Sequence, residues 1–160
     1  MALTAGLSAA QVAGTGTTVS IGGVTGVVSG TEIFVPIGEI KDLKHSGTKR
    51  ATTMSTNFAS LGVARKIGTI LDLGTLTMTC NRIGNDAGQI AVNAACIANG
   101  SYDFQVQMPV NALTGQTTKG DLITMSAIVT EAGSFDVSID KVSEYTFTLD
   151  LNSYTVTAGS

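Results

Sequence analysis

Few residues in this 160-residue sequence could take part in catalysis, and they are widely spaced. The single histidine, His45, belongs to no Asp–His–Ser or Cys–His arrangement that would indicate an activated nucleophile. Cys80 and Cys96 form no CxxC pair, and we expect both to be reduced, buried small hydrophobic residues. No HExxH, phosphate-loop or GxGxxG motif is present. We therefore expect no catalytic, metal or cofactor site and no enzyme activity.

Carboxylates supply the remaining chemical possibility, which is acid–base catalysis by an Asp/Glu pair. Asp136 with Asp140, and Glu144 with Asp150, are closely spaced near the end of the chain. All four alternate with apolar residues, so they fall on the polar faces of predicted strands. We interpret them as solvated surface carboxylates rather than as a glycosidase-type pair.

Basic residues gather in the stretch 41–68, which contains one acid, Asp42. We expect this stretch to be a long irregular inter-strand loop, and loops longer than about 12–15 residues are usually functional or disordered. Charge is also divided along the chain, with a net +3 in residues 1–82 and −6 in residues 83–160. Two interpretations follow: a solvated loop on an acidic protein, or a docking element whose positive charge meets an acidic surface on another copy of the chain.

Composition excludes several classes of protein. Charged residues are only 13%, against a typical value of about 25%, and 43% hydrophobic residues are enough to build a core, which argues against disorder. The net charge of −3 argues against a stand-alone nucleic-acid binder. The first basic residue is Lys41, so we expect no secretory signal, which would begin with a positively charged region. The uncharged stretch 2–31 is interrupted by Gly, Ser and Thr, so we expect no membrane span and synthesis in a cytosol.

Strand patterns dominate the chain. Its 23 threonines and 19 glycines, against two prolines, favour β-structure. Leu76, Met78 and Cys80 alternate with threonines, which is the period of a half-buried strand. Further strand-like stretches lie at 31–40, 102–108, 121–130, 135–140 and 144–151. Residues 131–134 (EAGS) predict a tight turn between two of these strands.

One stretch, 86–98, has helical periodicity instead, because small and apolar residues recur three and four positions apart. Asn85 or Asp86 is the candidate N-cap, and Gly100 follows the helix as a C-terminal glycine would. We therefore predict a mainly β fold: an antiparallel β-sandwich or barrel with one flanking α-helix, at about 86–98, and a long inter-strand loop, at about 41–68.

This order of elements resembles the major tail tube protein of long non-contractile-tailed phages, in the tail tube and type VI secretion tube superfamily. The stretches that carry the resemblance are TEIFVPIGEIKDL, GVARKIGTILDLGTLTMTCNR, DAGQIAVNAACIANG and SYDFQVQMP, followed by the strands over 121–151. The resemblance covers most of 31–157. It implies a single tail-tube-like β domain over 31–160, with the Gly/Ala/Thr-rich residues 1–30 as an arm or as the first strands of the same domain.

The function that the resemblance implies is structural. Such a protein self-assembles into rings, expected to be hexameric, which stack head to tail into the hollow phage tail tube, the conduit for genome delivery. Its partners would be copies of itself and other tail proteins, such as the tape measure protein, the tail terminator and the distal tail protein. DNA would pass through the lumen without specific binding, and Thr, Ser and Gln with some carboxylates suit such a lumen better than Lys and Arg. The expected location is the virion tail, assembled in the bacterial host cytoplasm.

In the family, the long inter-strand loop reaches the adjacent ring, a role that falls here on residues 41–68. The candidate inter-ring contacts are Lys44, Lys49, Arg50, Arg65 and Lys66. The possible acidic counterparts are Asp86, Asp103, Asp121 and Glu131. The tubes of contractile tails and of type VI secretion systems, which have the same fold, stay open as alternatives. So do another virion β-protein, such as a decoration or tail-completion protein, and a non-catalytic β-sandwich binding module. The absence of tryptophan weakens a sugar-binding version of the latter.

Overall fold

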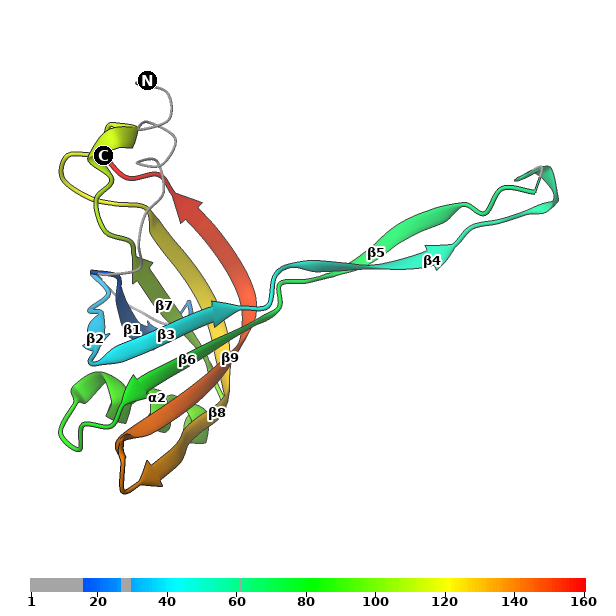
Figure 1. Ribbon diagram of the computed structural model, residues 1–160. Helices are drawn as coiled ribbons and strands as arrows, with labels where there is room; N and C mark the ends of the chain where they lie inside the picture. Colours follow the sequence, from blue (N-terminus) through cyan, green and yellow to red (C-terminus); the bar gives the residue numbers. More distant parts are fainter. Residues whose placement is uncertain (1–15, 27–29, 61) are drawn as a thin grey trace.

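The computed structural model of the chain describes residues 16–26, 30–60 and 62–160. Figure 1 shows a β-rich body with a long two-stranded extension that points away from it. The strands are β1 (Thr18–Val24), β2 (Val35–Ile37), β3 (Ile40–His45), β4 (Lys49–Met54), β5 (Lys66–Asp72), β6 (Thr75–Asn81), β7 (Ser101–Gln107), β8 (Leu122–Ser138) and β9 (Lys141–Thr157). The helices are the 3-10 turns η1 (Phe58–Ser60) and η2 (Ala112–Thr114) and the α-helix α2 (Ala87–Ala98).

The body is one antiparallel sheet of seven strands in the order β2-β1-β7-β8-β9-β6-β3, and β4 and β5 form a separate pair. The mainly β, antiparallel fold with one flanking helix is thereby confirmed. The end strands β2 and β3 do not pair with each other, so the sheet is not a closed barrel. Of the predicted arm 1–30, residues 1–15 and 27–29 lie outside the described ranges, and β1 forms within the rest.

The core lies on one face of this sheet, as the alternation of threonines with apolar residues predicts. Met78 and Leu76 on β6 are buried, and they lie opposite Phe147 and Leu149 on β9, which are buried too. Residues opposite each other in neighbouring antiparallel strands share a face, so these four pack together. The remaining large, fully buried side chains include Phe104, Val19, Val92 and Val106. Burial of each such apolar side chain contributes roughly 1.5–3 kcal/mol.

The helix begins and ends close to its predicted bounds. The Asp86 carboxylate accepts a hydrogen bond from the backbone N–H of Gln89 at 2.8 Å, which makes it the N-cap. Asn99 ends the helix in the left-handed conformation, with a φ of 51°. The buried Gln89 side chain donates to the Asn81 carbonyl at 2.8 Å and so ties the helix to the end of β6.

The stretch 41–68 is not an irregular loop, and that prediction is wrong. β3 and β6 continue beyond the body as β4 and β5, which pair from Lys49 opposite Asp72 to Met54 opposite Lys66. Every residue of β4 and β5 is exposed. Because neither face of this hairpin is buried within the subunit, its sequence lacks the apolar–polar alternation by which a strand is recognised. From here on, residues 49–72 are called the arm, and the predicted N-terminal arm is referred to only as residues 1–30.

The turn predicted at 131–134 is also wrong. β8 continues through this stretch, and the chain reverses at Ile139 and Asp140. The register of β8 with β9 shifts on either side of Glu131, so Gly133 lies in an irregular part of the strand and not in a turn. A Cβ at Gly133 would lie 2.8 Å from Asn93 Oδ1, so the glycine allows α2 to approach β8 closely.

Candidate assembly surfaces

The potentially reactive side chains have structural surroundings. His45 stacks on the Tyr154 ring, with centroids 5.5 Å apart, and its Nε2 lies 2.7 Å from the Leu73 carbonyl oxygen. Cys80 is buried, and burial, followed by the nearby Asp86 carboxylate, raises its pKa to about 11. Its thiol therefore stays protonated and is a poor nucleophile at neutral pH.

The paired carboxylates lie at the surface, as predicted. Glu144 forms an ion pair with Lys41, whose hydrogen bond and charge lower the pKa of the Glu144 carboxyl. Asp136 lies 3.8 Å from Lys141 Nζ, and both side chains are well exposed. Within the ranges that the structure describes, no group of three or more His, Cys, Asp and Glu side chains could hold a metal ion. In the same ranges, no helix has the length and apolarity needed to cross a bilayer.

The arm exposes many apolar side chains. Its large exposed hydrophobic residues are Met54, Phe58, Val63, Ile67, Ile70 and Leu71. A two-stranded hairpin is marginally stable at best without further packing. Exposed apolar patches usually mark interaction sites. The arm thus presents an apolar surface that no described segment of its own subunit covers.

The predicted basic contacts lie almost entirely on the arm. Lys49, Arg50, Arg65 and Lys66 belong to it, whereas Lys44 lies on β3 in the body. Among the described residues the ion pairs are Lys41–Glu144 and Lys141–Asp136, and neither involves a predicted contact. The arm thus carries four cations, none of which forms an ion pair with a carboxylate of the described residues.

The predicted acidic counterparts differ in their availability. Asp86 caps α2, and Asp103 accepts a hydrogen bond from the Thr25 hydroxyl at 2.7 Å. Asp121 accepts bonds from a side-chain amide at 2.7 Å and from a backbone amide at 2.9 Å. Glu131 is exposed on β8, where it lies opposite Thr148, and its carboxylate makes no hydrogen bond or ion pair within the described part of the subunit. Of the four, Glu131 is the carboxylate that is free for a partner.

Sequence reasoning missed one further surface, the end of the β8–β9 hairpin. The alternation of Phe135, Val137 and Ile139 with polar residues predicts a half-buried strand face. These three residues and Val142 are instead exposed, because the hairpin extends beyond the core. In the sequence, these exposed residues differ from core residues only in their distance from the largely buried stretch 125–129 of the same strand.

The face of the sheet opposite the core is polar. Across β1, β7, β8 and β9, one row of paired residues reads Ser20, Gln105, Thr124 and Thr155. Across β6 and β9, the rows are Thr77 with Thr148 and Thr79 with Thr146. This face therefore presents mainly hydroxyl and amide side chains.

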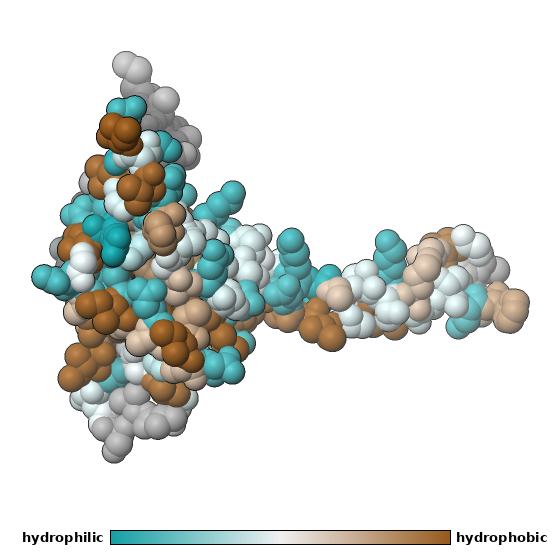
Figure 2. All heavy atoms as spheres, turned by 90° about the horizontal axis from the view of Figure 1, so that it is seen from below, coloured by the Kyte–Doolittle hydropathy of each residue, from teal (hydrophilic) through white to brown (hydrophobic). Residues whose placement is uncertain are grey.

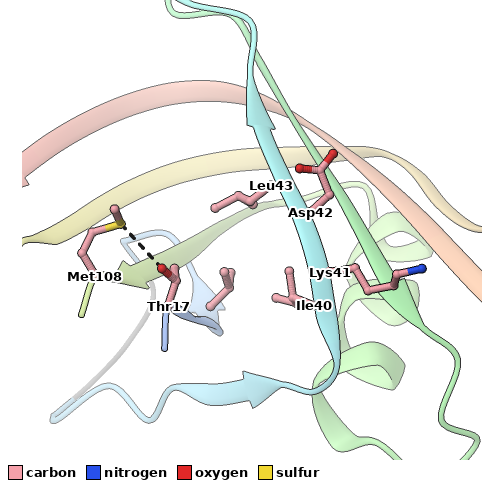
Figure 3. A pocket seen from close by; sticks show the side chains of 7 residues that line it. Thr17, Ile40, Lys41, Asp42, Leu43 and Met108 are labelled. Carbon is pink, nitrogen blue, oxygen red and sulfur yellow. Dashed lines mark hydrogen bonds between the residues drawn. The ribbon is translucent and has the colours of Figure 1, made fainter. Parts of the chain in front are cut away.

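An open gap separates β1 from the free edge of β3. It forms a pocket of about 280 Å³ between Thr17 and Met108 on one side and β3 on the other. Figure 3 shows Ile40 and Leu43 extending from β3 toward this pocket, whereas Lys41 extends away from it. The side of β3 that does not pair with β6 thus carries backbone groups without strand partners in the described sheet.

Comparison with known proteins shows which solved structures share this architecture. No protein-family model and no curated protein sequence matches the chain. Among solved structures, a chain of the SPP1 tail tube matches with a TM-score of 0.63 and 11% identity, over 92% of this chain and 80% of that one. The tail of an empty GTA particle, computed with C6 symmetry, matches with a TM-score of 0.63 and 15% identity, over 93% and 100% of the two chains. The chain has the tail tube fold.

The same tail tube fold occurs at the end of such an assembly. A chain of the anti-feeding prophage cap, described as its tube-terminating cap, matches with a TM-score of 0.62 and 15% identity, over 93% of this chain and 92% of that one. The resemblance inferred from the order of elements is therefore confirmed at the level of the fold.

Proposed function

We propose that this chain is a structural, non-enzymatic subunit that self-assembles into stacked rings and forms the hollow tail tube of a phage or phage-like particle. In a phage, DNA passes through the lumen during genome delivery. The other partners are tail proteins that bind the tube, such as a tape measure, a terminator and a distal tail protein. Assembly takes place in the bacterial host cytoplasm, and the protein resides in the virion tail.

The arm is the observation that carries this proposal. It exposes six large apolar residues, and its four cations form no ion pair within the described residues, on a hairpin without a packed face. Both features favour an arm that becomes buried against another copy. An arm that points away from its own body suits contact between successive rings (Figure 1).

Closure of a ring can use the edges of the body sheet. β2 has three residues with Pro36 among them, which limits its ability to pair, whereas β3 offers six residues beside an open pocket. We propose that the free edge of β3 contacts the neighbouring subunit within a ring. The C6 symmetry of the GTA tail supports six subunits per ring.

The polar face of the sheet is our proposed lining of the lumen. Its threonine, serine and glutamine side chains carry no positive charge that would bind phosphates. Passage of DNA through a tube requires weak contacts, and this composition supplies them.

A tail-completion role is the second candidate. It is favoured by the likeness to the tube-terminating cap, which matches as well as the tube proteins do. A terminator binds one end of a tube and does not add further rings. The two roles therefore differ in whether the purified protein forms tubes of stacked rings.

Electron microscopy of the purified, concentrated full chain at low and high salt tests the proposal. We expect hollow tubes with a regular axial repeat. The tubes should be shorter or fewer at high salt, because salt screens the attraction between exposed charges, with a screening length of about 10 Å at 0.1 M that shortens as the salt concentration rises. Single rings that never stack would favour the terminator. A chain that stays monomeric at every concentration, with or without its arm, would contradict both roles.

A further inference from the structure

One end of the body has an outward apolar surface that no other described segment covers. Helix α2 contains no charged residue, and on its outer face Ile90 is exposed and Ile97 is 87% exposed. A surface helix normally places charged and polar residues on its outer face, whereas a helix that is apolar all round is buried. α2 therefore has the composition of a helix that is covered on both sides.

The end of the β8–β9 hairpin continues this surface. Phe135 lies opposite Tyr145, which packs against the core, so Phe135 lies on the core face of the sheet, where α2 also packs. Phe135 is nevertheless 69% exposed, and Val137, Ile139 and Val142 are exposed beyond it. Figure 2 views the molecule from below, and the body there shows brown apolar side chains among polar ones.

The charge of this hairpin end is opposite to that of the arm. Residues 131–144 contain four acids and one base, and Glu131, Asp136 and Asp140 are exposed. The arm, 49–72, contains four bases and one acid. Each surface thus combines exposed apolar side chains with exposed charge, and the two charges are complementary.

We infer that the outer face of α2 and the hairpin end 131–144, which together we call the receiving surface, bind the arm of a second copy of this chain. The inference rests on the proposed function and names the partner surface that the function requires. The arm of the same copy cannot be the occupant, because it extends away from the body (Figure 1). Each copy offers one arm and one receiving surface, so the contact is heterologous and repeats from copy to copy.

The two kinds of side chain have different parts in this contact. Burial of apolar residues such as Phe58 from the arm and Ile97 from the receiving surface supplies affinity. Opposite charges steer the arm and set its register, and like charges exclude the reverse arrangement.

Chemical cross-linking of the full chain tests the inference. In a Cys96→Ser background, which leaves only the buried Cys80, Lys66→Cys is combined with Ile139→Cys, and a flexible bismaleimide is added. Each single-cysteine variant can form dimers at most, whereas an arm bound to a receiving surface links copy after copy. We expect a ladder of trimers and larger species from the double variant. Lys66→Cys with Lys119→Cys, an exposed site outside the receiving surface, is the matched control.

Sedimentation of the same samples separates the possible failures. A ladder no stronger than the control, from a chain that sediments as assemblies, would overturn the receiving surface and leave the proposed tube function standing. A chain that neither assembles nor cross-links would overturn both.

Charge reversal gives an independent measurement. We expect Asp140→Lys to raise the concentration needed for half-assembly by about tenfold, through repulsion of the arm. Lys66→Glu alone should have a similar effect, and the two together should recover much of the loss. Asp150→Lys, which makes the same change of charge on the polar face, is the control. Equal effects of Asp140→Lys and Asp150→Lys, without recovery in the double variant, would overturn the inference.

Discussion

His45 and Tyr154 stack with their ring centroids 5.5 Å apart at the point where the arm leaves the body. The same junction is closed by two hydrogen bonds, from Ser46 N to the Thr75 carbonyl at 2.9 Å and from Thr75 N to the Ser46 hydroxyl at 2.8 Å. The arm is therefore attached through a built junction rather than through a loose linker. A fixed attachment lowers the entropy that is lost when the arm binds a partner.

Glycine at position 74 is required by this junction. Gly74 has a φ of +82°, and a Cβ there would lie 2.5 Å from the Gly47 carbonyl oxygen. Gly47 has a φ of +87° but open space around it, so it is a matched control. We expect Gly47→Ala to lower the free energy of unfolding by about 1–2 kcal/mol through backbone strain. Gly74→Ala should cost roughly 1–3 kcal/mol more through overlap. Equal losses in urea denaturation would show that the close packing of the junction is not needed.

The two cysteines should differ in reactivity. Burial raises the pKa of Cys80 to about 11, and its side chain is inaccessible, whereas Cys96 is half-buried. Treatment of the native protein with iodoacetamide near pH 8 should modify Cys96 and leave Cys80 intact until the chain unfolds. Mass spectrometry of peptides at increasing urea concentration measures both rates. Modification of Cys80 without urea, at a rate similar to that of Cys96, would contradict the burial of Cys80 in the core.

Stability should depend on pH through the Lys41–Glu144 ion pair, which links β3 to β9 across β6. The hydrogen bond and charge of Lys41 lower the pKa of Glu144 in the folded state. The stabilisation is therefore complete above the pKa of an unperturbed glutamate, about 4.3, and is lost as the pH falls through the lowered folded value. Glu144→Gln should reduce this part of the acid dependence. If the free energy of unfolding of the variant and of the parent chain depended on pH in the same way, the Lys41–Glu144 ion pair would not contribute to stability.

The sequence predicts well where burial enforces a pattern. Leu76, Met78 and Cys80 alternate with threonines because one face of β6 meets the core, and the fold class follows from such strands. The spacing of small and apolar residues predicts a helix at about 86–98 with Asn85 or Asp86 as its cap, and the structure has Ala87–Ala98 capped by Asp86. In both cases the local sequence and the tertiary environment agree.

The arm could not be predicted in this way, because the described subunit buries neither of its faces. Both faces of β4 and β5 are exposed, so no alternation marks them as strands. The hairpin end at 131–144 misleads for the opposite reason, since Phe135 and Val137 alternate as core residues would but extend beyond the core. In both segments the residues depart from the pattern of an isolated domain, which is consistent with burial by other copies.

Deletion of the arm tests the central claim most directly. A variant without residues 49–72 joins Thr48 to Leu73 and keeps the hydrogen-bonded junction, so the seven-stranded body should fold with its circular dichroism unchanged. Electron microscopy of this variant beside the full chain, at equal concentration, measures assembly. Our account predicts tubes from the full chain and only folded, dispersed subunits or unstacked rings from the variant. Regular tubes from the variant would contradict the arm as the element that joins one ring to the next.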